Sequence, residues 1–209
     1  MTKNKIYITS ASRTATATLG KSLKNIPAEE LGSCVIDAVL KKSKINKSEV
    51  DEVIFGQVLT AGSGQNPARQ AAIKSGVSKE VPAYIVNQVC GSGLRSVVSG
   101  FQSIKSGYSK IVVSGGQENM SLAPHVMHLR DGKKLGDAKL VDTLIKDGLW
   151  DAFHGYHMGI TAENVAEQFQ ITREEQDKFA FKSQEKALTA QKEKKFNKEI
   201  INFKIKSNK

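Results

Sequence analysis

The hydrophobic positions along the chain follow two different spacings, and each spacing predicts one kind of element. Short runs rich in β-branched residues and bounded by Gly, Pro, Asn or Ser are typical of β-strands. Four such runs occur before residue 117, and an alternating run lies close to residue 209. Strands are therefore predicted in KIYITSAS (Lys5 to Ser12), EVDEVIFGQVL, PAYIVNQ, KIVVSGG and EIINFKIK.

Apolar residues three and four positions apart predict helices between these strands. The stretch from Ala28 to about Ser43 has such a pattern and opens after Pro27. Asn66 and Pro67 form the start of a second helix, and Gly76 ends it. Two more helices are predicted, one over GLRSVVSGFQSIKSG and one that opens with a capping box of Thr172 and Glu175 and runs to about Lys194.

The order of these elements predicts the fold class. Strands that alternate with helices require crossover connections, which place the strands in one sheet with helices on both faces. After Gly116 the chain becomes a long stretch rich in Met, Gly, His and Asp, and such irregular regions often carry function. We therefore expect an α/β protein, with an α/β half-domain over residues 1–120 and a loop domain over residues 121–209.

Composition narrows the possible function classes. The two cysteines, Cys34 and Cys90, are too few for a disulfide framework and lack the spacing of a structural zinc site. No run approaches the roughly 18 apolar residues of a membrane span, and the first residues lack the apolar segment of a signal peptide. These features predict a cytoplasmic protein with no membrane partner, in which Cys34 is an inert thiol near the core face of its helix.

The net charge of +10 raises the question of a polyanionic partner. Much of the excess lies after residue 176, where lysines alternate with Glu and Gln in a pattern typical of a solvated helix face. A nucleic-acid site would call for aromatic or Arg-rich interleaving or a known motif. We expect no nucleic-acid partner, although the same charge suits a phosphorylated small molecule such as a nucleotide-bearing thioester.

Cys90 stands between a predicted strand and a predicted helix, in the stretch NQVCGSGLRS. A helix start presents unpaired backbone N–H groups and a positive dipole end, which favour a thiolate and can hold a developing oxyanion. Gly91 and Gly93 would let a substrate approach the backbone. Two interpretations stay open on these residues alone: a nucleophile, which also needs a base, or a small core residue beside a turn.

Five stretches of the sequence are similar, in order and spacing, to signatures of one family: GQNPARQAA, VNQVCGSGL, GGQENMSLAPH, DGLWDAFHGYHMGITAENVA and ITREEQDKFAFKSQEKA. The chain resembles the N-terminal half of the thiolases, and among them the biosynthetic type that condenses acetyl-CoA. The resemblance implies a layered α/β fold, with a mixed sheet covered on both faces and part of an inserted loop domain. It also implies that Cys90 is the acylated residue and that its helix is buried at the centre of the fold.

The resemblance places pantetheine and acyl pocket positions on Leu149, His157 and Met158. A leucine and a thioether give an apolar wall, and an imidazole can make a directed hydrogen bond. The substrate would be a coenzyme A thioester with no separate cofactor, and the complete enzyme would be a homo-oligomer. No metal is expected, because His154 and His157 lack further convergent ligands, and the other histidines are assigned no role.

Three family signatures do not occur in the sequence: an Asn-Glu-Ala-Phe stretch, a Gly-His-Pro histidine and a second cysteine in a Cys-x-Gly-Gly-Gly turn. In the mechanism that the resemblance implies, this histidine activates the thiol and this cysteine removes the α-proton of the second acetyl-CoA. We therefore expect the N-terminal part of an enzyme that reversibly converts two acetyl-CoA to acetoacetyl-CoA and CoA, inactive without a complementing C-terminal half. The apolar helix surface that this half would cover should be exposed.

Two alternatives remain open. One is a non-catalytic module that keeps the fold for CoA binding or for assembly with a thiolase partner. The other is part of a degradative 3-ketoacyl-CoA thiolase that accepts longer chains. Met158, within HGYHMG, favours short unbranched chains over long ones.

Overall fold

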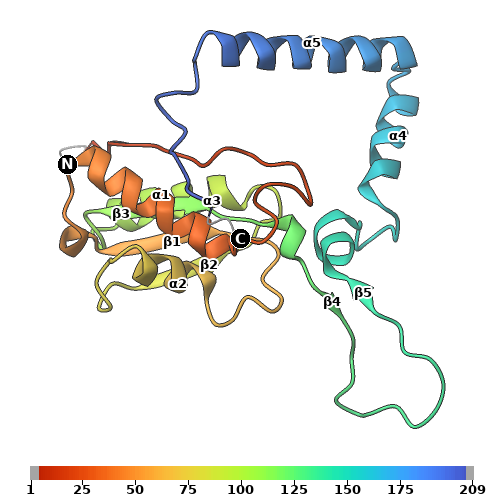
Figure 1. The fold of residues 1–209 in the computed structure, drawn as a ribbon, viewed down its shortest axis with the longest axis horizontal. Helices are drawn as coiled ribbons and strands as arrows, with labels where there is room; N and C mark the ends of the chain where they lie inside the picture. The colour runs from red at the N-terminus through yellow and green to blue at the C-terminus, as the bar shows by residue number, and fades with distance from the viewer. Residues whose placement is uncertain (1–4, 206–209) are drawn as a thin grey trace.

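A three-stranded parallel sheet forms the centre of the computed structural model, which describes residues 5–205. The strands are β1 (Glu52–Gly56), β2 (Ala83–Val86) and β3 (Val112–Gly116), in the spatial order β2-β1-β3 (Figure 1). β1 is buried along its whole length, because it lies between two neighbours and beneath helices on both faces. This position explains its unbroken apolar run, and the three middle strand predictions are confirmed.

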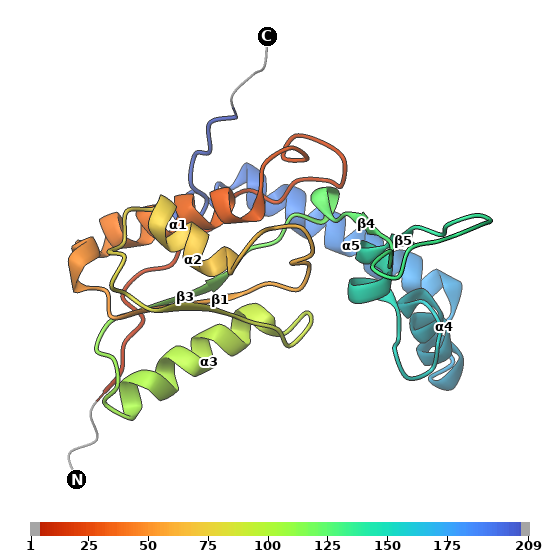
Figure 2. The same cartoon turned by 90° about the horizontal axis from the view of Figure 1, so that it is seen from below.

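Helices cover both faces of this sheet. α1 (Ala28–Ser43) and α2 (Pro67–Lys74) lie on one face and α3 (Ser92–Lys105) on the other (Figure 2). The predicted start of α2 is confirmed, because the side chain of Asn66 accepts the backbone N–H of Arg69. The predicted α/β class is thus confirmed. In the described chain this central sheet is parallel, and antiparallel strands pair elsewhere.

The hydrophobic core lies between the sheet and the layer of α1 and α2. Three alanines on α2 present a flat surface, which lets this helix approach α1 and β1 closely. Large side chains from the sheet and from α1 fill the space that remains. The buried members are Ile36, Leu40, Val50, Val53, Phe55, Ala68, Ala71, Ala72, Val77, Val81 and Val113.

α3 has two unlike faces. Ser92, Ser96 and Gly100, each four residues apart, are buried against the sheet. A Cβ added to Gly100 would lie 2.5 Å from the Oγ of Ser114, so this face has room for small residues only. The opposite face is apolar and exposed in the described structure, which confirms the expected uncovered surface, and burial of the helix at the centre of the complete fold stays a prediction. The residues of the exposed face are Leu94, Val97, Val98 and Phe101.

Two strand predictions are wrong. Residues 5–12 form no strand, and the stretch EIINFKIK, whose Lys206 lies outside the described residues, forms none either. A strand needs a partner for its backbone groups, and these two stretches meet at one point. The Arg13 N–H donates to the Glu199 carbonyl at 2.8 Å, and the Ile201 N–H donates to the Arg13 carbonyl at 2.9 Å. In the described chain one parallel bridge, between Ile200 and Arg13, the residue directly after the first stretch, is the only ladder pairing between these two parts.

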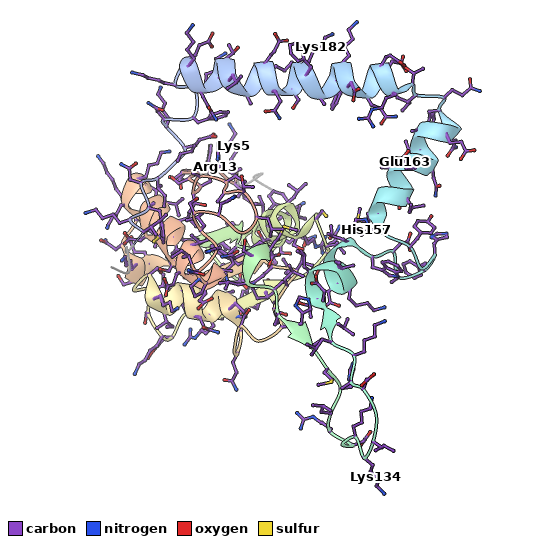
Figure 3. The ribbon with its side chains drawn as sticks, turned by 45° about the vertical axis from the view of Figure 1, so that its right-hand side comes forward. Lys5, Arg13, Lys134, His157, Glu163 and Lys182 are labelled. Atoms are coloured by element: carbon purple, nitrogen blue, oxygen red, sulfur yellow. The ribbon has the colours of Figure 1, made fainter. Side chains whose placement is uncertain are left out.

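Beyond the sheet, a short antiparallel ribbon carries a long loop. The ribbon pairs β4 (His125–Val126) with β5 (Val141–Asp142), and Lys134 lies at the tip of the connecting loop (Figure 3). Three short helical turns complete the irregular parts. They are η1 (Lys47–Glu49), η2 (Met120–Leu122) and the π-helical η3 (Leu144–Leu149).

The last two helices stand away from the sheet. α4 (Met158–Gln168) and α5 (Arg173–Lys192) have no buried residue, and Figure 1 shows both outside the layered core. The predicted capping box is confirmed: the Thr172 hydroxyl accepts the Glu175 N–H at 3.2 Å, and the Glu175 carboxylate accepts the Thr172 N–H at 2.9 Å. Among residues 5–205, no helix combines the length and apolar character that crossing a bilayer requires.

Candidate functional site

The turn between β2 and α3 carries Cys90 and is held by side chains on both sides of it. The Oδ1 of Asn87 accepts the Val89 N–H at 2.9 Å. The Oγ of Ser92 accepts the Gln88 N–H at 2.9 Å and donates to the Val89 carbonyl at 2.6 Å. Val89 has a left-handed backbone with φ of 48°. For a β-branched residue this conformation is strained, at a cost of about 1–3 kcal/mol, so the turn is a strained elbow.

Two glycines set the position of the first turn of α3. A Cβ on Gly56 would lie 2.4 Å from the carbonyl carbon of Ser92, and one on Gly116 would lie 3.5 Å from the Cα of Gly93. Gly56 and Gly116 are paired as the last residues of β1 and β3. Cys90, just before α3, therefore lies at the carboxyl edge of a parallel sheet, where open α/β folds bind their ligands.

The thiol of Cys90 is exposed and free. Two histidines of the described chain face carboxylates instead: His125 Nε2 is 3.8 Å from Asp142 Oδ2, and His154 Nδ1 is 3.0 Å from Asp151 Oδ2. Within residues 5–205, no hydrogen bond joins the Cys90 sulfur to a base. The elbow therefore presents a thiol without the base that nucleophilic catalysis needs.

The other cysteine has a different environment. Cys34 is half-buried on α1. Burial raises the pKa of its thiol above the usual value, and the carboxylates of Asp37 and Glu30 raise it further. A thiol that resists ionisation is a poor nucleophile. This result supports the prediction that Cys34 is a packed, unreactive residue.

The three predicted pocket residues lie at the two ends of one loop. Leu149 ends η3, His157 is the N-cap residue of α4, and Met158 is the first residue of that helix. An antiparallel bridge between Trp150 and His157 brings the two ends together. Figure 3 shows His157 where this loop leads into α4. In the described structure no hydrogen bond joins the three to Cys90.

The imidazole of His157 has a defined orientation. Its Nδ1 accepts the backbone N–H of Gly159 at 2.9 Å and so caps the first turn of α4. A ring nitrogen that accepts a hydrogen bond carries no proton, so the hydrogen of the neutral ring is on Nε2. His157 therefore offers its Nε2–H as a donor to a ligand.

The loop before His157 is closed around Asp151. Its Oδ1 accepts the N–H groups of Phe153 at 2.8 Å and His154 at 2.9 Å. The Asp151 N–H donates to the Tyr156 carbonyl at 2.8 Å, and the Gly155 N–H donates to the Asp151 carbonyl at 2.9 Å. The backbone N–H of His154, followed by its ring, holds the pKa of the Asp151 carboxyl below the usual value. An aspartate followed by a nearby glycine is a turn signal in the sequence, although no role is predicted for this residue there.

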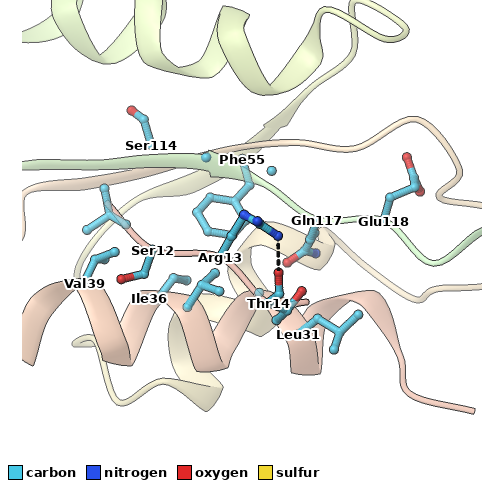
Figure 4. Close-up of a pocket in the computed structure, with 15 residues that line it drawn as sticks. Ser12, Arg13, Thr14, Leu31, Ile36, Val39, Phe55, Ser114, Gln117 and Glu118 are labelled. Carbon is cyan, nitrogen blue, oxygen red and sulfur yellow. Dashed lines mark hydrogen bonds between the residues drawn. The ribbon is translucent and has the colours of Figure 1, made fainter. Parts of the chain in front are cut away.

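A cavity of about 190 Å³ lies between α1, β3 and residues 12–14 (Figure 4). The Oε1 of Gln117 is buried in the described structure and has no hydrogen-bond partner. Burial raises the pKa of Glu118, although the N–H groups of Val58 and Leu59 lower it. Because four separate segments line this cavity, no spacing in the sequence could predict it. The part of the chain that the structure describes contains no cluster of three or more His, Cys, Asp or Glu residues suited to a metal ion.

Several curated proteins named acetyl-CoA acetyltransferase are similar to the chain. The protein of Rhizobium meliloti is 56% identical over 209 residues, which cover 100% of this chain and 53% of that protein. The protein of Cupriavidus necator is 59% identical over 197 residues, covering 94% of this chain and 50% of that protein. A cytosolic relative from Rattus norvegicus is 52% identical over 204 residues, covering 98% and 51%. The chain thus spans about half the length of the curated relatives it matches.

A solved structure shares the fold. The crystal structure of Acat5 thiolase from Ascaris suum in complex with coenzyme A has a TM-score of 0.89 and 39% sequence identity. The match covers 93% of this chain and 51% of that chain. Residues 6–209 also match the family described as thiolase, N-terminal domain. The sequence signatures, the layered fold and these matches agree, and the chain belongs to the thiolase family.

Proposed function

We propose that the chain is the thiol-bearing part of an acetyl-CoA C-acetyltransferase, an enzyme that reversibly converts two acetyl-CoA molecules to acetoacetyl-CoA and CoA. One observation carries this proposal: Cys90 is an exposed thiol on an elbow at the start of α3, at the carboxyl edge of the sheet. The relatives that are named for this activity match the chain over nearly its whole length, which supports the assignment.

In this function Cys90 carries the acetyl group between two steps. Its thiolate attacks the carbonyl carbon of acetyl-CoA, and CoA leaves as its thiolate to give acetyl-Cys90. The start of α3 supplies backbone N–H groups and a positive dipole end near the oxyanion that forms. A second acetyl-CoA, after losing an α-proton to a base, attacks acetyl-Cys90. A carbon–carbon bond forms and the Cys90 thiolate leaves.

The proton acceptors for these steps are assigned to a complementing C-terminal half. A general base contributes about 10²- to 10⁴-fold to such a step, and groups that act together lose most of their effect when one is missing. The support for this assignment is that the chain spans about half the length of its relatives. We also assign the complete enzyme to a homo-oligomer, and keep the domain boundary at residue 120 as a prediction.

The substrate pocket is assigned to Leu149, His157 and Met158. The leucine and the thioether suit the apolar part of the pantetheine arm, and the Nε2–H of His157 suits one of its oxygen acceptors. The CoA thioester is then the substrate itself, with no separate cofactor and no metal. A cytoplasmic location is proposed as well, with support from the relatives of rat and mouse that are named cytosolic.

The function is tested by complementation. The full chain is co-expressed with the part of the Rhizobium meliloti enzyme that the match does not cover, and thiolysis of acetoacetyl-CoA by CoA is measured. Wild type should be active, and Cys90→Ser should lower the rate by at least about a thousandfold. Cys34→Ser is the matched control, because it removes the other free thiol and should leave the rate within about twofold.

Mass spectrometry of the denatured complex completes the test. An acetyl group on the peptide that contains Cys90 is expected after mixing with acetyl-CoA, and none is expected on Cys34. Binding of CoA without any turnover would instead favour the non-catalytic module. A higher rate on long 3-ketoacyl-CoA substrates than on acetoacetyl-CoA would favour a degradative thiolase.

A further inference from the structure

We propose that Asp151 is a positioning residue for CoA-thioester binding, because it holds the loop that aims His157 and Met158 at the substrate. The inference rests on the proposed function, since it concerns the same pocket. Asp151 does not touch reacting atoms in this proposal. It acts through the shape of the Trp150–His157 loop, which joins the two halves of the predicted pocket.

Hydrogen bonds to Asp151 define much of the shape of this loop. Phe153 is 96% exposed, so its ring does not anchor the loop by packing. The side chain of Asp151 accepts two backbone N–H groups at 2.8 and 2.9 Å, and its Oδ2 lies 3.0 Å from Nδ1 of the His154 ring. Its own N–H and carbonyl make two more hydrogen bonds across the loop. Removal of this one side chain therefore removes three of the hydrogen bonds that order the loop and leaves the two that the Asp151 backbone makes.

The loop transmits its shape directly to His157. The hydrogen bond from the Asp151 N–H ends at the carbonyl of Tyr156, the residue before His157. The Trp150–His157 bridge then fixes the backbone of His157 itself, whose φ of −69° and ψ of 144° suit an N-cap residue. In this backbone conformation the imidazole Nδ1 reaches the Gly159 N–H at 2.9 Å. The direction of the Nε2–H donor thus depends on the loop.

His154 adds a second clamp to the same loop. Its ring contacts the Asp151 carboxylate through Nδ1 at 3.0 Å. The ring also stacks on Tyr156, with ring centroids 5.6 Å apart and an angle of 26° between the planes. Asp151, His154 and Tyr156 therefore form a connected set beside the proposed pocket, which the sequence analysis left without a role.

The first test separates substrate binding from chemistry in the complemented enzyme. Asp151→Ala should raise the KM for acetoacetyl-CoA about tenfold and change kcat less than about twofold, because the loop binds ground state and transition state alike. Asp151→Asn keeps an oxygen acceptor for the two backbone N–H groups, so its KM should stay within about threefold of wild type.

The matched control is Asp51→Ala. Asp51 also accepts two backbone N–H groups through one oxygen, from Lys110 at 2.7 Å and Ile111 at 2.9 Å, but it lies at the opposite end of the sheet. Asp51→Ala removes the two hydrogen bonds of this carboxylate far from the pocket, so it should lower the melting temperature and leave the KM unchanged. A similar KM for Asp151→Ala and wild type would overturn the inference, and so would an equal rise in both alanine variants.

The second test needs no activity and reads His157 directly. Histidine side chains of the full chain are labelled with ¹⁵N, and NMR identifies which ring nitrogen carries the hydrogen. Wild type should show the Nε2–H form of His157 alone, and Asp151→Ala should show a fraction of the Nδ1–H form as well, because the loosened loop no longer holds Nδ1 at the Gly159 N–H. An unchanged Nε2–H signal in Asp151→Ala would overturn the inference, even where the proposed activity itself had failed.

Discussion

The Cα of Gly56 faces the backbone of Ser92 so closely that a Cβ at position 56 would lie 2.4 Å from the Ser92 carbonyl carbon. Gly56→Ala should therefore push the start of α3 away from β1. We expect a loss of about 1–3 kcal/mol in the free energy of unfolding, as for other overpacked sites. Urea unfolding of the full chain, followed by circular dichroism, measures it.

Gly93→Ala is the matched control for this prediction. It makes the same change one residue further along the contact, but an added Cβ there meets nothing within 4 Å. Its free energy of unfolding should be unchanged or higher by up to about 1 kcal/mol, because alanine favours a helix over glycine. Equal stabilities of the two variants would contradict the close contact between β1 and α3.

The protein should become more stable when Val89 is replaced by glycine. Its φ of 48° costs a β-branched residue about 1–3 kcal/mol, whereas glycine adopts it freely. The added freedom of the unfolded chain offsets about 0.5–1 kcal/mol, so a net gain of about 1 kcal/mol is expected for Val89→Gly. Val98→Gly, on the exposed face of α3, should instead lose roughly 0.5 kcal/mol. Thermal unfolding of both variants decides whether the elbow is strained.

Stability should depend on pH through Asp51. The backbone N–H groups of Ile111 and Lys110 hold the pKa of its carboxyl below the usual value. The folded state therefore favours the ionised form, and this contribution is present above the unfolded pKa of about 3.9 and lost as pH falls through the folded pKa. Asp51→Asn should be less stable than wild type at pH 7, and the two should be equally stable once the pH is below the folded pKa of Asp51. A difference that persists through acid unfolding would contradict this assignment.

The exposed apolar face of α3 should make the isolated chain associate. Leu94 is 73% and Phe101 47% exposed, on the same side of the helix. Contiguous apolar surface of this kind is rare on stable monomers. Replacing both residues by Gln should lower the apparent mass at high concentration in size-exclusion chromatography with light scattering. Phe153→Gln, which removes an isolated exposed phenylalanine, should leave the apparent mass as in wild type.

Features that depend only on residues close together in the sequence could be predicted from it. The cap of α2 needs only Asn66 and the N–H of Arg69, and the capping box of α5 needs only Thr172 and Glu175. Cys90 was found for the same reason, because a strand, a cysteine and two glycines before a helix lie within one short stretch. Local chemistry decides such features, so the residues themselves carry the signal.

Features that depend on distant partners could not be predicted. The apolar, β-branched content of residues 5–12 is that of a strand, but pairing occurs at Arg13 alone, with Glu199 and Ile201. Whether a run of alternating residues becomes a strand depends on which edge it meets, and the pattern does not contain that information. The hydrogen bonds of Asp151 could not be predicted for a related reason, since all five form only when the loop is closed.

The face of α3 that is buried against the sheet carries only small residues, so a larger side chain on this face would displace the helix as a whole. Gly100 lies ten residues after Cys90, and a Cβ there would meet the Ser114 hydroxyl at 2.5 Å. Because a helix is stiff over its length, a wedge at one end tilts the other end instead of being absorbed locally. Gly100→Ala should therefore also shift the first turn of α3, and with it the backbone next to Cys90, about 15 Å away.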